Sequence, residues 1–492
     1  MRGFANAARA APRIRASLSK SHPRCRAMIT TTPALKIHQQ HGNSVDNITD
    51  RTADATTTKP IPDAASSASS ASSASFAPTA PTGAPILKKT PLYDLHIAHG
   101  AKMVPFAAHS MPIQYPSASI TDSHHFTRQH ASLFDVSHMV PHFFRGPHAA
   151  SFLERVTPSD WTNQPLMQSK LTAFLWPCSG GIVDDAMITR TGEEEFYVVT
   201  NGACLEKDTA YLERELGEFR RGEGGVEWSM PGGSALLALQ GPQAQEILGE
   251  MLVVPEGGEG LEGLFFANAA YMEVRISAGE REGEGVGQTE KVLVTRGGYT
   301  GEDGFEIFFD GDTCAAAEAA AKFAEMLLKV AGPERLQLAG LGARDSLRLE
   351  AGMCLYGHDL DDATTPVEAG LNWVIDKSRR HETAGFHGAE KIAWQMVPKN
   401  KGGAGVERRR VGFFVEGAPA REGADVQFEG ESVGKITSGI PSPTLGKNIA
   451  MGYVRDGLHK PGTELDVVVR GRLRKAAVTR MPFYAPRYYR KA

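Results

Sequence analysis

Residues 171–189 read LTAFLWPCSGGIVDDAMIT, and our interpretation of the fold starts from this stretch. Two apolar, β-prone runs, 171–176 and 186–189, flank paired glycines that are typical of a tight turn. Side chains alternate faces along a strand, so of Asp184 and Asp185 one is expected to point to solvent and the other inward. The inward carboxylate is a candidate for chemistry. Because Asp also favours turns, a turn-capping role for the pair stays open.

The length and charge of the chain limit the classes of function that fit it. At 492 residues it is long enough for two or three domains, and no run of about 18 apolar residues predicts a membrane span. Residues 1–45 contain basic side chains and no acidic one, so the excess of 57 acidic over 53 basic residues is larger in the remainder. An acidic body argues against general binding to a nucleic-acid backbone.

The first 88 residues have the composition of two segments that lie outside the folded body. Residues 1–32 are rich in Arg, Ala and Ser and free of acids, which is typical of a mitochondrial transit peptide and predicts a matrix protein. Residues 33–88 turn polar and then low in complexity, with only Ala and Ser from 64 to 75. Such a segment buries too little apolar surface to offset its ordering entropy, so we expect a disordered spacer.

From residue 90 onward the pattern predicts an α+β fold. We expect helices at 90–100, with Thr90 as the N-cap, and at 121–133, 203–219, 241–251, 313–330 and 343–352. Strand-like runs lie between these helices. Two Gly- and Glu-rich stretches, 256–260 and 278–287, are interpreted as solvated insertions. After a boundary at 398–405, short strands at 410–415, 425–428, 434–437, 449–454 and 465–469 predict a small β-barrel.

Several residues suggest chemistry of other kinds. Four histidines (His124, His125, His130 and His138) invite a metal interpretation, but they lack the i, i+4 pair with Glu that zinc proteases use, so no metal is expected. Cys178 precedes the glycine turn but has no His nearby in the sequence to act as its base, and buried Cys is usually inert. A cysteine nucleophile is therefore disfavoured.

Two further patterns stay ambiguous. Arg344 and Arg348 lie one helical turn apart, which suits either a clamp for a carboxylate or a pair on the surface. The run from Gly297 to Ile307 is rich in glycine, which permits close approach of the backbone to a ligand but also suits a simple hairpin loop.

The motifs of the folded body together resemble one family. Thr90-Pro-Leu-Tyr93, Phe134-Asp-Val-Ser-His-Met139, Gly180-Gly-Ile-Val-Asp-Asp185, Gly298-Tyr-Thr-Gly-Glu-Asp-Gly304, Ala343-Arg-Asp-Ser-Leu-Arg-Leu-Glu-Ala-Gly352 and Thr437-Ser-Gly439 follow in this order. The chain resembles the aminomethyltransferases, the T-proteins of the mitochondrial glycine cleavage system, from about residue 90 to 489. Residues Trp176 to Ser179, Lys170 and the insertion at 278–287 depart from the pattern that we expect of this family.

The resemblance implies a three-domain ring around a central folate cavity, with folate-binding domains at 89–398 and a C-terminal barrel at 405–490. It also implies that the carbon of an aminomethyl group on the lipoyl arm of H-protein passes to tetrahydrofolate, with release of ammonia. Asp185 falls on the family's catalytic position. The positions that bind folate correspond to Asn201, Glu306, Arg344 and Tyr488.

These residue types suit the implied reaction. A carboxylate such as Glu306 can accept paired N–H donors from a pterin, and Asn201 can both donate and accept. Asp185, expected to be ionised from an ordinary pKa near 3.9, could position a folate nitrogen. Dimethylglycine and sarcosine oxidases share a similar folate domain, but they add a flavin domain with a G-x-G-x-x-G motif that this chain lacks. Folate-binding iron–sulfur assembly factors are the non-catalytic alternative, and their characteristic Lys-Gly-Cys-Tyr-like motif is missing as well.

Overall fold

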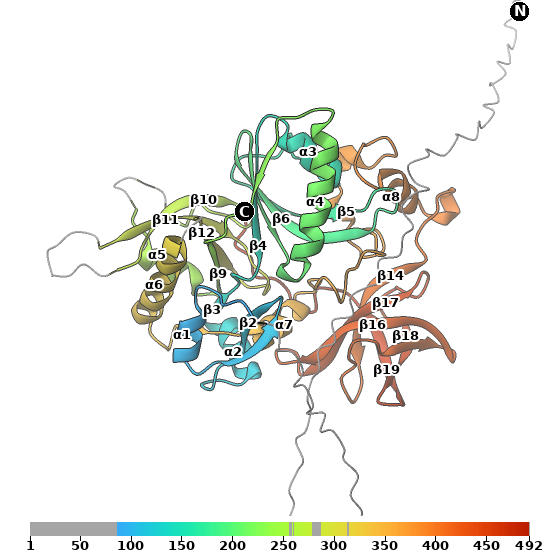
Figure 1. Ribbon diagram of the computed structural model, residues 1–492. Coiled ribbons are helices and arrows are strands. Elements are labelled where there is room, and N and C mark those ends of the chain that lie inside the picture. The colour runs from blue at the N-terminus through green and yellow to red at the C-terminus, as the bar shows by residue number, and fades with distance from the viewer. Residues whose placement is uncertain (1–85, 255–257, 259, 278–286, 312–313, 492) are drawn as a thin grey trace, which may run out of the picture. The chain divides into compact units, whose positions relative to one another are not determined.

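The computed structural model describes residues 86–254, 258, 260–277, 287–311 and 314–491 (Figure 1). The predicted transit peptide, nearly all of the predicted spacer and most of both predicted insertions lie outside these residues. Helices and strands alternate through most of the described chain, and a closed barrel ends it. No helix among the described residues is long and apolar enough to cross a membrane.

A six-stranded sheet in the order β10-β11-β12-β9-β3-β13 is antiparallel except between β3 and β13. Helices α5 (Ala244–Met251) and α6 (Cys314–Ala331) pack on one of its faces (Figure 1). Leu237 and Leu239 of β9 face these helices, whereas Leu236 and Ala238 face the other way. This alternation is what a strand buried on both faces requires. The strands span Ala131–Asp135 (β3), Ala235–Gln240 (β9), Ala269–Arg275 (β10), Thr289–Arg296 (β11), Gly304–Phe309 (β12) and Leu336–Leu338 (β13).

A five-stranded antiparallel sheet in the order β5-β6-β7-β4-β8 contains the glycine turn. Helices α3 (Ala149–Val156) and α4 (Leu205–Arg220) cover one face of this sheet (Figure 1). The short 3-10 helix η2 (Gly202–Cys204) joins β7 to α4. The strands span Val140–Arg145 (β4), Ser169–Leu175 (β5), Ile182–Gly192 (β6), Glu195–Thr200 (β7) and Glu227–Ser229 (β8). The hairpin predicted around the paired glycines is therefore present.

The faces of the two sheets that carry no helices share one apolar core. The Phe308 ring of the six-stranded sheet lies 4.5 Å from the Tyr197 ring and 6.1 Å from the Phe143 ring of the five-stranded sheet, between centroids. Met187 of β6 packs against the same core. Side chains on this face of β6 therefore point toward the second sheet and not toward bulk water.

Three further elements lie beside the six-stranded sheet: α1 (Tyr93–Ala98), the hairpin of β1 (Lys102–Phe106) and β2 (His109–Gln114), and α7 (Leu341–Glu350). The expected Thr90 cap is wrong, because α1 begins at Tyr93 with Leu92 as an N-cap that makes no side-chain bond. Helix α2 (Ile120–Gln129) also ends four residues earlier than expected. Ala131–Asp135 is entirely buried and pairs with both β9 and β13, so sheet pairing outweighs the helical pattern there.

The C-terminal strands form a closed barrel in the order β14-β17-β16-β15-β18-β19, which confirms the predicted small β-barrel and the α+β class. Their bounds are Arg408–Val415 (β14), Asp425–Phe428 (β15), Glu431–Ser442 (β16), Lys447–Arg455 (β17), Glu464–Val469 (β18) and Arg472–Thr479 (β19). Strand β19 was not predicted, because its charged first half hides the alternation that buries Ala476 and Val478. Helix α8 (Ala389–Met396) precedes the barrel.

Candidate active site

Strand β6 places its adjacent carboxylates on opposite faces. Asp184 is completely buried and points, like Ala186 and Ile188, to the side covered by α3 and α4. Asp185 lies on the side of Met187, which faces the second sheet, and keeps part of its surface accessible. The alternation is as expected, but the expectation that one Asp points to solvent is wrong because helices cover the Asp184 face.

The glycine pair before these carboxylates is required by packing. Gly180 has a positive φ of 62°, and a Cβ on Gly181 would lie 1.9 Å from the Asp362 carbonyl oxygen. The Ile182 amide donates to the Thr364 carbonyl at 2.9 Å. A side chain at Gly181 would therefore separate the turn from the segment 361–364 and move the strand that carries Asp185.

Asn201, the residue that follows β7, joins the two carboxylates directly. Its backbone N–H donates to Asp184 Oδ2 at 2.9 Å, and its side-chain Nδ2 donates to Asp184 Oδ1 at 2.8 Å. The same Nδ2 donates to Asp185 Oδ1 at 2.9 Å. An amide nitrogen has two hydrogens, so Asn201 can serve both acids at once. Two residues predicted for the site thus lie in contact.

The environment of Asp185 changes its acidity. Burial raises the pKa of Asp185 to about 7, and the negative charge of Asp184 acts in the same direction. The expectation of an ordinary pKa near 3.9 is therefore wrong, because it ignored the neighbouring acid and the surrounding protein. A carboxyl group with this pKa can both accept and release a proton near neutral pH, as an acid–base catalyst must.

A second group of predicted residues gathers around Glu306 of β12 and Arg344 of α7. Burial raises the pKa of Glu306, and the Arg344 charge lowers it, so the two charges lie close enough to interact. The Arg344 guanidinium lies 4.7 Å from the centre of the Tyr299 ring. Burial raises the pKa of Tyr299, and both Asp185 and Arg344 affect it. Tyr299 therefore links the Asp185 region to the Glu306 region.

Two hydrogen-bond donors in and near this second group have no partner among the described residues. Arg344 Nη1 and the Tyr197 hydroxyl are both buried and have no hydrogen-bond partner among the described residues. Burial raises the pKa of Tyr197, and the Glu306 charge raises it further. Buried polar atoms are nearly always paired in folded proteins, so the two unpaired donors close to the Glu306 carboxylate mark a candidate place for a polar ligand.

The two arginines of α7 have different surroundings. Arg348 is buried, and its Nη1 donates to Asp359 at 2.6 Å. Its Nη2 donates to Ser438 of the barrel at 2.9 Å. The surface-pair alternative is therefore wrong. Arg348 connects α7 to the barrel, whereas Arg344 Nη1 has no hydrogen-bond partner among the described residues.

Tyr488 lies in the segment that follows the barrel. Its ring stacks on Phe266 with 4.1 Å between centroids, and burial raises its pKa to about 12. The Arg487 backbone N–H donates to the Gly301 carbonyl at 2.8 Å, so this segment contacts the loop that carries Tyr299. The contacts of the Tyr488 ring itself are with Phe266 and Arg490, which are not partners of Glu306 or Arg344.

Tyr197 and Tyr299 were not predicted as residues of the site. Side chains two positions apart in a strand share a face, so Tyr197 and Val199 are expected on the same side of β7 as Asn201. This spacing could have indicated Tyr197 as a residue of the site. Tyr299 was visible as an aromatic residue inside a glycine-rich loop, but its contact with Arg344 depends on a helix forty-five residues away along the chain.

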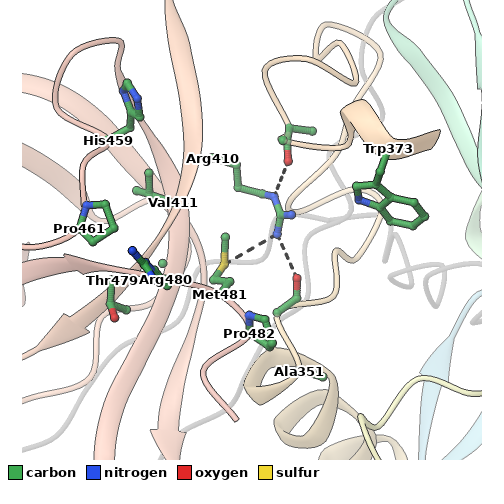
Figure 2. A pocket seen from close by; sticks show the side chains of 14 residues that line it. Ala351, Trp373, Arg410, Val411, His459, Pro461, Thr479, Arg480, Met481 and Pro482 are labelled. Atoms are coloured by element: carbon green, nitrogen blue, oxygen red, sulfur yellow. Dashed lines mark hydrogen bonds between the residues drawn. The ribbon is translucent and has the colours of Figure 1, made fainter. Parts of the chain in front are cut away.

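A separate cavity of about 370 Å³ lies where the barrel meets residues 351–373 (Figure 2). Arg410 crosses it, and its Nε donates to the Ala369 carbonyl at 2.8 Å and its Nη1 to the Gly352 carbonyl at 3.1 Å. The predicted site residues are not among the described residues that line this cavity. The candidate active site is placed at Asp185 and Asn201 because their side chains are in direct contact.

Comparison with protein families gives two matches along the described chain. The GCVT N-terminal domain matches residues 92–379, and the glycine cleavage T-protein C-terminal barrel domain matches residues 408–485. These segments contain Asp185, Asn201, Glu306 and Arg344 in the first match and the barrel in the second.

Relatives of similar length support the same grouping. A probable mitochondrial aminomethyltransferase from Schizosaccharomyces pombe is 45% identical over 404 residues, which is 82% of this chain and 95% of that protein. The mitochondrial aminomethyltransferase of Saccharomyces cerevisiae is 44% identical, over 82% of this chain and 96% of that protein. The crystal structure of glycine cleavage system aminomethyltransferase T from Bartonella henselae is 36% identical with a TM-score of 0.68, and covers 82% of this chain and all of that one.

Proposed function

The chain belongs to the family of glycine cleavage T-proteins and is an aminomethyltransferase, and from this premise we propose that Asp185 is its catalytic carboxylate. The observation that supports this assignment is the Asn201 amide, which binds Asp184 and Asp185 together and leaves Asp185 partly accessible. The names of the relatives favour a transferase over a non-catalytic iron–sulfur assembly factor.

Tetrahydrofolate is the co-substrate that the family implies. We propose that its pterin ring binds at Glu306, where a partly buried carboxylate would accept paired N–H donors. The unpaired Arg344 Nη1 and Tyr197 hydroxyl would then donate to pterin oxygen or nitrogen atoms. Tyr488 is proposed to contact the same co-substrate from the C-terminal segment, which reaches the Gly301 loop.

The other substrate is proposed to be the aminomethyl group on the lipoyl arm of H-protein. In the net reaction, two folate N–C bonds form to the methylene carbon, and its bonds to nitrogen and sulfur break. The two protons lost from the folate nitrogens appear on ammonia and on the lipoyl thiol, giving 5,10-methylenetetrahydrofolate. No net oxidation takes place.

An acid–base role for Asp185 is supported by its contact with Asn201 and by burial, which raises its pKa to about 7. In its ionised form it accepts a proton from an attacking folate nitrogen, and in its protonated form it returns that proton to the departing ammonia. Negative charge beside the carbon also stabilises an iminium-like transition state. Asn201 fixes the carboxylate for this work through its 2.9 Å bond to Asp185 Oδ1.

The reaction is tested with H-protein that carries an isotopically labelled aminomethyl carbon. We expect the label in 5,10-methylenetetrahydrofolate, with one ammonia released for each carbon transferred. Label that stays on H-protein while tetrahydrofolate is present would contradict the proposal.

The proposed acid–base role predicts a particular pH dependence. Because the pKa of Asp185 is raised to about 7, the ionised base is lost as the pH falls through about 7. We expect kcat/KM to fall roughly tenfold for each pH unit below that value. A rate that stays constant between about pH 5 and 8 would show that ionised Asp185 is not required.

The chain is mitochondrial, as the names of its relatives state for them. We propose the matrix as its compartment, since residues 1–32 have the composition of a transit peptide. A fluorescent reporter fused to residues 1–32 is expected to be protected from protease by the inner membrane. A reporter that remains in the cytosol would contradict this.

A further inference from the structure

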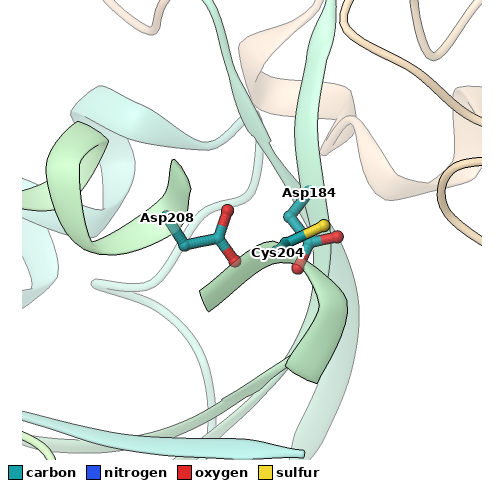
Figure 3. A group of neighbouring side chains, drawn as sticks. All are labelled: Asp184, Cys204 and Asp208. Atoms are coloured by element: carbon teal, nitrogen blue, oxygen red, sulfur yellow. The ribbon is translucent and has the colours of Figure 1, made fainter. Parts of the chain in front are cut away.

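Asp208 is a buried acid on the first turn of α4. It is 0% exposed, and neither of its carboxyl oxygens has a hydrogen-bond partner among the described residues. Its carboxyl group points toward Asp184 and Cys204, and ligand atoms of these three side chains lie within 4.8 Å of one another (Figure 3). A buried charge needs a compensating partner, so this group requires an explanation.

The two carboxyl groups differ in the donors that face them. Both oxygens of Asp184 already accept N–H groups from Asn201, at 2.9 and 2.8 Å. Such bonds favour the ionised form of Asp184. Asp208 accepts no N–H group among the described residues, although the Thr200 hydroxyl is close enough to lower its pKa, and the Lys207 ammonium beside it donates to Tyr356 and Asp362. A proton shared between the two acids therefore belongs on Asp208.

We propose that Asp208 is a positioning residue, a neutral carboxylic acid whose O–H donates to Asp184 and so holds Asp184 against Asn201 and Asn201 against Asp185. Burial and the negative charge of Asp184 raise the pKa of Asp208 to about 10, while Lys207 and the Thr200 hydroxyl lower it. Burial raises the pKa of Asp184, whereas the hydrogen bonds that Asp184 makes with Asp208 and Asn201 lower it.

A divalent cation among Asp184, Cys204 and Asp208 would explain the cluster differently. The contacts favour a proton, because Asn201 occupies both oxygens of Asp184 and burial raises the pKa of the Cys204 thiol. A thiol must lose its proton to bind a metal. The metal alternative is an outcome of the experiment below.

Two variants of the full chain separate a neutral donor from other roles. Asp208→Asn keeps the shape and an N–H donor, so turnover is expected to stay within about threefold of the unmodified chain. Asp208→Ala removes the donor, and turnover is expected to fall roughly 10-fold. Without the Asp208 donor, the pKa of Asp184 rises and Asp184 is more often neutral. A neutral Asp184 no longer raises the pKa of Asp185, so the midpoint of the pH–rate profile of Asp208→Ala should shift to lower pH. The profile of Asp208→Asn should not shift.

Infrared spectroscopy of the resting protein measures the proton without any substrate. At neutral pH we expect a carboxylic-acid carbonyl band that Asp208→Asn removes. The proposal is overturned if this band is missing, if Asp208→Asn lowers turnover as much as Asp208→Ala, or if the chain binds one equivalent of a divalent metal that Asp208→Asn abolishes. The turnover and pH measurements rest on the proposed function, whereas the infrared measurement does not. A chain with the band but without transfer activity would therefore refute the function and not the protonation.

Discussion

Asp185→Asn is expected to lower turnover by about 10²-fold or more. The substitution preserves the size of the side chain and the oxygen that accepts the Asn201 bond, so the local geometry should survive. It deletes the charge and the ability to exchange a proton near neutral pH. Single-turnover rates at saturating tetrahydrofolate, together with folate affinity and melting temperature, separate catalysis from binding and stability.

Asp94→Asn provides a matched control. Asp94 is an exposed residue in the first turn of α1, and the same chemical change there should leave turnover unaltered. Asp184→Asn is a poorer control, because Asp184 is buried and accepts two bonds from Asn201. If Asp185→Asn retains nearly full turnover, the catalytic carboxylate has been assigned to the wrong residue.

The second large effect is expected at the proposed pterin site. Glu306→Ala removes the acceptor for two pterin donors, and leaving such donors unpaired costs about 1–3 kcal/mol, or roughly 5- to 150-fold in the dissociation constant. Glu306→Gln keeps one acceptor oxygen and should lose less affinity. Isothermal titration calorimetry with tetrahydrofolate measures both changes.

The stability of these variants must be followed as well. Glu306→Ala leaves the partly buried Arg344 charge without its neighbouring carboxylate, so the melting temperature is expected to fall. Glu213→Ala, at an exposed position of α4, is the control for a Glu-to-Ala change. Unchanged folate affinity in Glu306→Gln and Glu306→Ala would remove Glu306 from the site.

Local sequence patterns predicted much of this architecture. Alternating apolar residues and paired glycines predicted the hairpin that carries Asp184 and Asp185, and evenly spaced short strands predicted the barrel. The predictions were wrong where contacts between distant segments determine the secondary structure. The helix beginning at Ile120 ends at Gln129 because the following residues pair with strands more than one hundred positions away.

The acid–base properties of the site could not be predicted from the sequence, because they depend on packing. Asp185 has an ordinary acidity in an isolated strand, and only burial beside Asp184 raises its pKa. The burial of Asp208 could have been predicted, because it lies four residues before Leu212 and eight before Leu216 and so shares their buried face of α4. A charged residue on an apolar stripe was a sign of a buried acid, although its partner Asp184 becomes apparent only after folding.

The dependence of ammonia release on tetrahydrofolate tests the central claim most directly. With aminomethyl-loaded H-protein as the substrate, ammonia release is expected to require both the chain and tetrahydrofolate, and Asp185→Asn should reduce the folate-dependent rate by about 10²-fold or more. Ammonia release at the same rate without tetrahydrofolate, or a folate-dependent rate that Asp185→Asn leaves unchanged, would contradict the account.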